Sequence, residues 1–342
     1  MILAGDIGGT KCAFTLFEQD GSALKPVYRF HEPTREAHSL EELLTRFIAS
    51  AAQAGFPTSN GQLSSAAFGC AGTVLEDKVV SNNLPWAVER KSIANTLNLD
   101  FQKIVLLNDL VAAAASLVHL RKTDVLQLNE GKAQPGAPMA LIAAGTGLGE
   151  AILFSDGTRY QIFPSEACLT DFAPRNDREF LLLQSLRQRI PRVCTEEIIS
   201  GRGFRAIHQI IFPGVQHAFF DEPGVDPAVK ITQQAFAGSC GACVETLQIW
   251  TEAYGAEAGN MALRVLPFGG VYIAGGIAVK ILPKLKDGSF VRAFSDKMKL
   301  STQLAKIPIF VVLNEDAPVI GAAHEALAVS CATKQATANQ EP

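Results

Sequence analysis

Short apolar segments separated by tight turns dominate the first 30 residues. Residues 2–4 are apolar, residues 11–17 place Cys12, Phe14 and Leu16 on one face, and Asp20-Gly21 precedes an extended segment. Apolar residues at every second position and an Asp-Gly pair are typical of strands joined by hairpins. The pattern therefore predicts three successive strands, over residues 2–4, 11–17 and 23–30.

The next segment changes to a helical pattern. Ser39 and Glu42 form a capping box, and apolar residues from Leu40 to Ala51 recur at helical spacing. Two buried strands are predicted further along, over residues 64–71 and 103–107, with a short helix over 93–97 between them.

A second round of the same pattern begins near residue 138. An apolar strand is predicted over 139–143, a glycine-rich turn follows, and strands over 150–154 and 159–163 flank Asp156-Gly157. The same order of strand, glycine turn, strand, hairpin and strand therefore occurs twice, which indicates an internal duplication. Residues 179–263 are mostly helical in pattern, and the small, polar tail from Ala332 is predicted to be frayed.

Length and composition fit this plan. The 342 residues suggest two domains, and 48% hydrophobic residues, 19% charged residues and 28 glycines describe a globular α/β chain. Thirty Lys and Arg residues against 34 Asp and Glu residues give a net charge of −4. This balance gives no reason to expect a nucleic acid or an anionic membrane as a partner.

The cysteines point to a reducing compartment. Seven cysteines are an odd number with irregular spacing, and most lie in apolar segments, so we expect buried free thiols. Cys240 and Cys243 form a Cys-x-x-Cys pair, but no partner pair follows at zinc-finger spacing, which argues against a metal or redox site there. The chain starts without a cleavable leader pattern and has no apolar stretch of membrane-spanning length, so a cytoplasmic protein is expected.

Two glycine turns are candidate phosphate-binding loops. Asp6-Ile-Gly-Gly-Thr10 lies in the first turn, and Gly145-Thr-Gly-Leu-Gly149 lies in the matching turn of the second round. Backbone amides of such turns can point toward an anion. The alternative is that each turn only needs glycine for a tight hairpin. A third glycine-rich segment, residues 268–276, brackets a strand and offers a flat backbone surface for a base or ribose.

Asn108 and Asp109 follow a predicted strand and open an alanine-rich helix. A carboxylate at the carboxyl end of a buried strand is a common place for an active-site group. Both residues are also good helix caps, so the alternative is a purely structural cap.

Taken together, these segments resemble, in order and spacing, the actin-like sugar kinases, and specifically the bacterial glucokinase family. The resemblance runs from residue 2 to about residue 328 and includes Asp171-Phe-Ala-Pro174 and Ser200-Gly-x-Gly203. It implies two actin-like (ribonuclease H-like) α/β lobes, each a mixed sheet flanked by helices. The expected small lobe is 1–109 plus 319–331, the large lobe with helical additions is 110–318, and 332–342 form a flexible tail.

The resemblance also implies an activity. The family transfers a phosphoryl group from ATP, with Mg²⁺, to the 6-hydroxyl of glucose, and its two lobes close over the sugar. The helical part of the second lobe offers room for a homodimer interface.

Site residues are implied by the same resemblance. Asp109 matches the catalytic base, Asn108 a sugar ligand, and Glu166 and Glu196 the two glutamates that accept hydrogen bonds from sugar hydroxyls. Asp6 matches a residue that acts near Mg²⁺ through water. The expected nucleotide-binding residues are Asp6, Ile7, Gly8, Gly9, Thr10, Lys11, Gly145, Thr146, Gly147, Gly275 and Gly276.

One departure from the family affects the choice of sugar. The segment after the first glutamate commonly reads Glu-Gly-Gly-His, whereas it reads Glu166-Ala-Cys-Leu169 here. Leucine neither donates nor accepts a hydrogen bond, although Cys168 or Thr170 could compensate. Two alternatives follow: a kinase for a different hexose, or a catalytically weakened sugar-sensing regulator.

Overall fold

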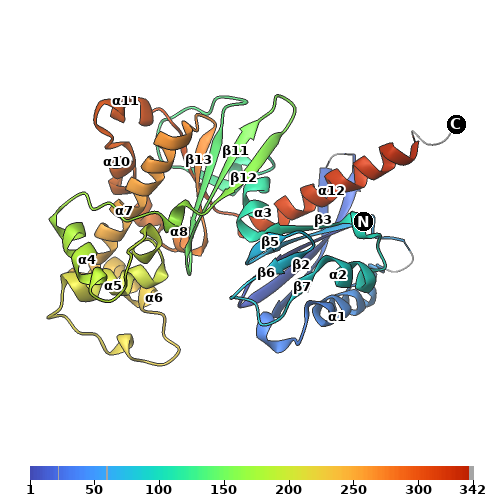
Figure 1. Ribbon diagram of the computed structural model, residues 1–342, viewed down its shortest axis with the longest axis horizontal. Helices are drawn as coiled ribbons and strands as arrows, with labels where there is room; N and C mark the ends of the chain where they lie inside the picture. Colours follow the sequence, from blue (N-terminus) through green and yellow to red (C-terminus); the bar gives the residue numbers. More distant parts are fainter. Residues whose placement is uncertain (22, 59–60, 339–342) are drawn as a thin grey trace. The chain divides into compact units, whose positions relative to one another are not determined.

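The computed structural model describes residues 1–21, 23–58 and 61–338. It divides into two compact units: unit 1 combines Met1–Arg121 with Asn314–Pro342, and unit 2 is Lys122–Leu313 (Figure 1). The expected lobe boundaries, after residue 109 and before residue 319, stay a prediction. The compact units have different limits because helix α3 (Asp109–Ser116) packs against helix α12 (Ala317–Ala338) within unit 1.

Unit 1 contains a five-stranded mixed sheet with helices on both faces and a separate, small three-stranded antiparallel sheet formed by its fifth to seventh strands. Its strands are β1 (Ile2–Ile7), β2 (Lys11–Asp20), β3 (Ala23–Pro33), β4 (Ser65–Cys70), β5 (Thr73–Leu75), β6 (Lys78–Val80), β7 (Val88–Glu89) and β8 (Ile104–Asn108). Its helices are α1 (Leu40–Gln53), α2 (Arg90–Leu97), α3 (Asp109–Ser116) and α12 (Ala317–Ala338), with 3₁₀ turns η1 (Thr34–Glu36) and η2 (Phe101–Lys103).

Strand β1 is the centre of the main sheet of unit 1. The strand order is β3-β2-β1-β4-β8, in which β1–β2 and β2–β3 are antiparallel and β1–β4 and β4–β8 are parallel. Alternate side chains of β1 enter different cores: Leu3 and Ile7 pack on the side of α1, and Ile2 and Ala4 on the side of α12. Burial on both faces explains why this strand is apolar.

The predicted capping box forms with one change of partner. Ser39 accepts a hydrogen bond from the Glu42 amide, so α1 begins at Leu40 as expected. The Glu42 carboxylate, however, accepts from the amide of His38 rather than from that of Ser39.

Unit 2 contains the second copy of the plan and additional helices. Its strands are β9 (Val125–Gln127), β10 (Met139–Ala144), β11 (Leu148–Ser155), β12 (Tyr160–Ser165), β13 (Gly270–Ala274) and β14 (Ile309–Val312). Its α-helices are α4 (Asp177–Arg187), α5 (Gly201–Ile211), α6 (Pro227–Ala237), α7 (Gly241–Val265), α8 (Gly276–Lys280), α9 (Leu282–Leu285), α10 (Ser289–Ser295) and α11 (Ser301–Leu304). The 3₁₀ turns are η3 (Lys122–Asp124), η4 (Ala167–Leu169), η5 (Thr195–Glu197), η6 (Ala218–Phe220) and η7 (Met298–Leu300).

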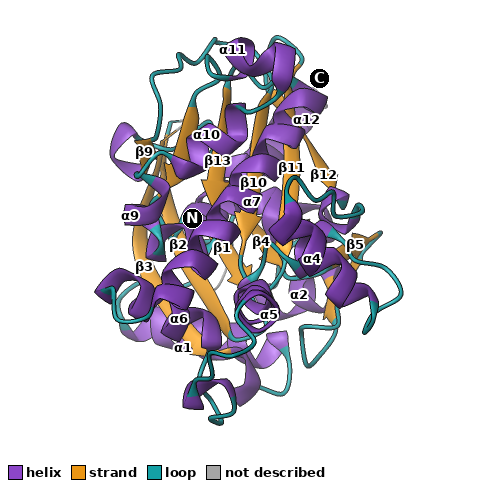
Figure 2. Cartoon of the chain, turned by 90° about the vertical axis from the view of Figure 1, so that its left-hand side faces the viewer, coloured by secondary structure: helices purple, strands orange, loops and turns teal. Residues whose placement is uncertain are grey.

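The sheet of unit 2 repeats the topology of unit 1. Its order is β12-β11-β10-β13-β14-β9, with antiparallel β10–β11 and β11–β12 pairs and parallel β10–β13 and β13–β14 pairs. Only β9, antiparallel at the β14 edge, is added. The predicted duplication and the predicted fold class are confirmed. The long helix α7 packs against β10 (Figure 2).

Helix α7 holds the central strand and the start of α5 in place. The buried Trp250 donates its indole N–H to the carbonyl of Ser200, and the buried Tyr254 donates its hydroxyl to the carbonyl of Ile142. The Trp250 ring stacks on Phe204 of α5, with ring centroids 4.6 Å apart. These contacts fix two backbone segments that later carry the candidate site.

The structure also bears on the predictions for the cysteines, the C-terminal tail and membrane-spanning segments. None of the seven cysteines forms a disulfide, but only four have the predicted burial: Cys12, Cys70, Cys168 and Cys243 are buried, Cys194 and Cys240 are half-buried, and Cys331 is exposed. The predicted flexible tail begins as helix, because α12 continues to Ala338 through residues that favour helix; residues 339–342 lie outside the described part of the chain. Among the described residues, no helix is both long and apolar enough to cross a bilayer.

The contact between α12 and α3 at Gly321 gives a stability prediction. A Cβ on Gly321 of α12 would overlap the carbonyl oxygen of Ala112 in α3. Gly321→Ala should therefore lower the free energy of unfolding by about 1–3 kcal/mol, as measured by urea denaturation. Gly241→Ala, another helical glycine with no atom near its Cβ position, is the control and should be neutral or stabilising. An unchanged unfolding midpoint for Gly321→Ala would contradict the close packing.

Candidate active site

The first glycine turn of unit 1 joins β1 to β2. The Gly8 amide donates to the carbonyl of Lys11 over 3.1 Å and closes the turn. Among the described residues, the amides of Gly9 and Thr10 have no hydrogen-bond partner. A Cβ on Gly9 would lie 2.8 Å from the carbonyl oxygen of Asn83, so the turn needs glycine for space as well. The turn is thus both a tight hairpin and a pair of available amide donors.

Asp6 and Asp109 lie near each other in unit 1. Burial, together with the negative charge of Asp109, raises the pKa of Asp6 to about 6, while Lys11 acts in the opposite direction. The parallel pairing of β1, β4 and β8 explains the proximity, because their carboxyl ends share one edge of the sheet. The structure therefore brings together two acidic residues that are 103 positions apart in the sequence.

Asn108 is the N-cap of α3, as the structural alternative proposed. Its Oδ1 accepts from the amides of Leu110 and Val111, and its Nδ2 donates to the carbonyl of Gly72. One N–H of the side chain remains for a ligand. Asp109 is the first helical residue and accepts from the Leu110 amide over 2.9 Å. The cap therefore fixes the backbone on which Asp109 sits.

The second glycine turn, in unit 2, is also closed by a glycine amide, although its hydrogen bond spans two residues rather than three. The Gly145 amide donates to the carbonyl of Gly147 over 2.8 Å, and the amides of Thr146 and Gly147 have no partner in the described chain. The Gly201 amide donates to the carbonyl of Gly145 and attaches α5 to this turn. Both turns therefore close through the amide of one glycine and leave the next amides available.

Glu196 is connected to the second glycine turn. Its Oε2 accepts from the Leu148 amide over 2.9 Å, and a Cβ on Gly147 would lie 2.5 Å from the same oxygen. Its Oε1 pairs with Arg202, at 2.6 Å, and Arg202 also pairs with Glu197, at 3.1 Å. Sequence reasoning missed Arg202, because a separation of six residues across η5 and α5 matches no regular helix spacing.

Glu166 and Glu196 both lie near Cys168. Burial raises the pKa of the Cys168 thiol to about 12, and the charges of Glu196 and then Glu166 add to this effect. Glu166 itself is exposed at the start of η4. The structure thus brings together the two glutamates that the sequence predicted as sugar ligands.

The residues that could compensate for the missing histidine are poorly placed for it. Leu169 is 51% exposed, whereas Cys168 is buried in the hydrophobic core of unit 2. The hydroxyl of Thr170 donates to the carbonyl of Ala167, so it can only accept from a ligand.

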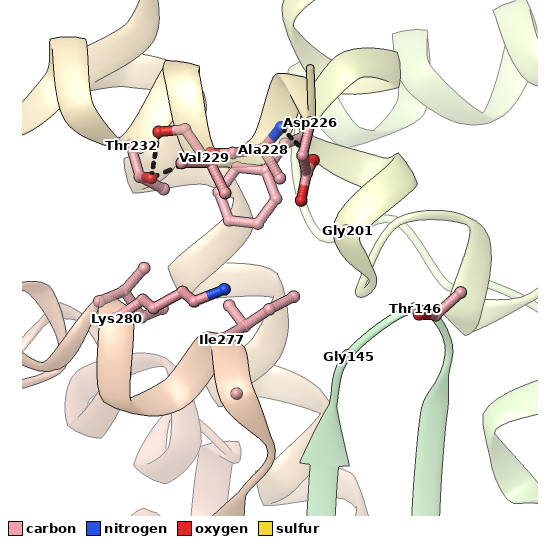
Figure 3. Close-up of a pocket in the computed structure, with 12 residues that line it drawn as sticks. Gly145, Thr146, Gly201, Asp226, Ala228, Val229, Thr232, Ile277 and Lys280 are labelled. Carbon is pink, nitrogen blue, oxygen red and sulfur yellow. Dashed lines mark hydrogen bonds between the residues drawn. The ribbon is translucent and has the colours of Figure 1, made fainter. Parts of the chain in front are cut away.

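A cavity of about 210 Å³ opens beside the second glycine turn (Figure 3). Gly145, Thr146 and Gly276 form one wall, and the start of α6 with Asp226 and Thr232 forms another. Lys280 of α8 points its ammonium group into the space between α8 and α6 (Figure 3). Gly275, at φ +87°, is required here because a Cβ would overlap the carbonyl oxygen of Ala144. Sequence reasoning found the glycines but missed Asp226, Thr232 and Lys280.

The described residues fit a nucleotide and a divalent cation. The open amides of the two turns suit phosphate oxygens, and no atom lies within 4 Å of a Cβ placed on Gly145 or Gly276, so a ligand can approach the backbone. The raised pKa of Asp6 beside Asp109 indicates a pair of carboxylates that a nearby cation would stabilise in the charged form.

Glu150 is a buried acid that sequence reasoning missed. It follows the second glycine turn on β11, is only 1% exposed, and its Oε1 has no hydrogen-bond partner among the described residues. Burial raises its pKa from 4.5 to about 7; the charge of Glu257 adds to the shift and Arg264 opposes it. The only sign of this burial in the sequence is that Glu150 stands in a predicted strand whose other inward-facing residues are apolar.

Comparison with known proteins agrees with this geometry. The duplicated sheets, each with a glycine turn after its central strand, define the actin-like class of sugar kinases. A family model described as "Glucokinase" matches residues 3–329. The chain belongs to the glucokinase family.

Individual relatives match over nearly the whole chain. It is 39% identical to a glucokinase of Nostoc sp., over 94% of this chain and 98% of that protein, and 34% identical to one of Synechocystis sp., over 94% and 96%. A solved structure, the glucokinase from an Antarctic psychrotroph, superposes with a TM-score of 0.81 at 26% identity, over 96% of this chain and 98% of that one.

Glu150 gives a pH-dependence prediction. Its folded pKa is above its unfolded value, so between pH 4.5 and pH 7 the folded state binds a proton that the unfolded state has lost. Stability from this group is present at low pH and falls as the pH rises through this window, by about 3 kcal/mol in total. Glu150→Gln should remove this loss and be more stable than the wild type at pH 8.

Urea denaturation at pH 5, 6, 7 and 8 measures the effect. Glu130→Gln, an exposed glutamate of the same unit, should follow the wild-type pH dependence. If Glu150→Gln and the wild type lose stability in parallel across this range, the assigned pKa shift is wrong.

Proposed function

We propose that the chain is a glucokinase that transfers the γ-phosphoryl group of ATP to the 6-hydroxyl of glucose. The observation that carries the proposal is the placement of Asp109: a carboxylate at the carboxyl end of β8, on the first residue of α3, beside Asp6. Membership of the glucokinase family supports the same reaction.

Asp109 is the proposed catalytic base. It would accept the proton of the sugar hydroxyl as that oxygen attacks phosphorus, which is the task of the acidic residue in phosphoryl transfer to an alcohol. The Asn108 cap supports this role, because its bonds to Leu110, Val111 and Gly72 restrict the backbone that carries Asp109. The remaining N–H of Asn108 is the proposed contact to a sugar hydroxyl.

The amides of the two glycine turns are the proposed phosphate ligands, with Ile7, Gly8 and Lys11 flanking the first turn. Gly275 and Gly276 border the cavity beside α6, which we assign to the base and ribose of the nucleotide. Asp6 would hold Mg²⁺ through water. When bound, the ion would neutralise part of the negative charge of the phosphates.

Glu166 and Glu196 are the proposed acceptors for sugar hydroxyls. Glu196 is held by Arg202 and by the Leu148 amide, so its carboxylate has a fixed orientation. Glu166 is exposed and close to Cys168, on the same side of unit 2 as Glu196.

A second candidate is a kinase of the same mechanism for a different hexose, and exposed Leu169 is the observation that favours it. A coupled assay of ADP release with glucose, mannose, fructose and N-acetylglucosamine separates the two. The proposal predicts the highest kcat/KM for glucose. Negligible turnover of glucose beside rapid turnover of another hexose would favour the second candidate, and turnover of none would favour a sugar-sensing regulator.

Asp109→Asn tests the mechanism. The amide cannot accept the hydroxyl proton, so kcat should fall by about 10²- to 10⁴-fold while the Kd for glucose changes little. Asp100→Asn, an exposed acid of the same unit, is the control and should keep wild-type turnover. Near-normal turnover by Asp109→Asn would rule out the assigned base.

Leu169→His tests the missing sugar contact. If a sugar hydroxyl lacks a partner beside Leu169, the imidazole should lower the KM for glucose about tenfold, since an unmatched polar group costs about 1–3 kcal/mol. The KM for ATP should stay unchanged, and Leu169→Ala, which adds no donor, should not improve the KM for glucose. A KM for glucose that does not change in Leu169→His would place the family contact elsewhere.

Cytoplasmic location and assembly as a homodimer are further parts of the proposal. Light scattering coupled to gel filtration would measure the assembly state, with a mass of two chains expected.

A further inference from the structure

Four potential metal ligands meet in unit 2 away from the glycine turns. They are His208 near the end of α5, His217 just before η6, and Cys240 and Cys243 at the start of α7. One ligand atom from each residue lies within 4.8 Å of the corresponding atoms of the other three. The sequence showed no sign of a metal site because no further ligand pair follows the two cysteines. In the folded chain, two histidines that precede the cysteines in the sequence lie beside them.

The distances within the cluster fit a tetrahedral ion. Zinc binds sulfur at about 2.3 Å and nitrogen at about 2.0–2.1 Å, which places a sulfur and a nitrogen ligand about 3.6 Å apart on a tetrahedron. The Nε2 atom of His217 lies 3.5 Å from Cys240 Sγ and 3.6 Å from Cys243 Sγ.

His208 supplies a second, independent observation. Its side chain is fully buried, and neither ring nitrogen has a hydrogen-bond partner among the described residues. An imidazole carries a donor and an acceptor, and burying both without partners is unfavourable. Coordination of a metal by one of these nitrogens would remove part of that cost.

The surroundings favour a closed structural site. The rings of Phe212, Phe219 and Phe220 pack against the two histidines, with centroids 4.7 to 5.9 Å away, and limit access of water. The Cys243 amide donates to Cys240 Sγ over 3.4 Å, a bond that favours a thiolate. The side-chain amide of Gln234 is 3.5 Å from Cys243 Sγ and can turn its NH₂ group toward a thiolate.

We propose that His208, His217, Cys240 and Cys243 bind one structural Zn²⁺ ion. Two thiolates and two imidazoles are a donor set that selects zinc among common divalent ions, and four protein ligands leave no open position for catalysis. On binding, each cysteine releases its thiol proton to solvent and forms a Zn–S bond, and no oxidation is involved.

The ion would connect α5, the segment before α6 and the start of α7. Helix α5 contacts the second glycine turn through Gly201, and the first residues of α6 line the nucleotide cavity. The zinc site would therefore stabilise the walls of that cavity without touching a ligand in it.

Metal analysis of the untagged, full-length protein tests the proposal. After dialysis against metal-free buffer, we expect about one zinc ion per chain. Replacement by Co²⁺ should give the visible absorption of a tetrahedral ion together with a thiolate charge-transfer band. Less than about a tenth of an ion per chain after refolding with zinc, or a cobalt spectrum without the thiolate band, would overturn it.

Variants locate the ion. Cys243→Ser and His217→Ala should lose the bound zinc, whereas the exposed-site controls Cys331→Ser and His38→Ala should retain it. His217→Cys keeps a zinc ligand at the same place and should retain the metal, which separates loss of a ligand from loss of folding. Zinc content that is the same in Cys243→Ser and the wild type would contradict the assignment.

Thermal unfolding gives a readout independent of activity. Zinc chelation should lower the unfolding midpoint of the wild type by several degrees and leave that of Cys243→Ser unchanged, because the variant has no ion to lose. An unchanged wild-type midpoint after complete removal of zinc would show that the cluster does not stabilise the fold through a metal.

Discussion

Four backbone amides in two hairpin turns have no hydrogen-bond partner among the described residues, and the proposed chemistry depends on these donors. They belong to Gly9 and Thr10 in the first turn and to Thr146 and Gly147 in the second. In both turns a glycine amide closes the hairpin, Gly8 to Lys11 and Gly145 to Gly147, and leaves the following two amides available. The net charge of −4 shows no surplus of cations over the whole chain, although Lys11 flanks the first turn and Lys280 lines the cavity beside the second. Backbone amides with Mg²⁺ are therefore the proposed means of holding a polyphosphate.

The remaining groups of the candidate site are fixed by short polar contacts to backbone. Asn108 bonds to Leu110, Val111 and Gly72 and sets the position of Asp109, while Glu196 bonds to the Leu148 amide directly after the second turn. Each unit thus attaches an acidic site residue to rigid elements rather than to a free loop. Such preorganisation is what phosphoryl transfer needs, since most of its catalysis is positioning and charge stabilisation.

Local patterns predicted the first three strands of each sheet well, because short turns join β1, β2 and β3 and also β10, β11 and β12. The alternation around Phe14 and the turn at Asp156-Gly157 predicted real strands, and the repeated order predicted the duplicated topology. Features set by three-dimensional packing were out of reach. They are the pairing of Arg202 with Glu196 across η5 and α5, the burial of Glu150, and the meeting of His208 with Cys240. The glycine turns were found because glycine has a local signature, whereas Lys280 beside the cavity has none.

The central claim is that this chain phosphorylates the 6-hydroxyl of glucose. The most direct measurement is proton-coupled ³¹P NMR of the product formed from glucose, ATP and Mg²⁺. We expect a phosphomonoester resonance split by the two hydrogens on C6, in amounts equal to the ADP released. ADP release without a phosphomonoester, or a product with phosphate on another carbon, would contradict the account.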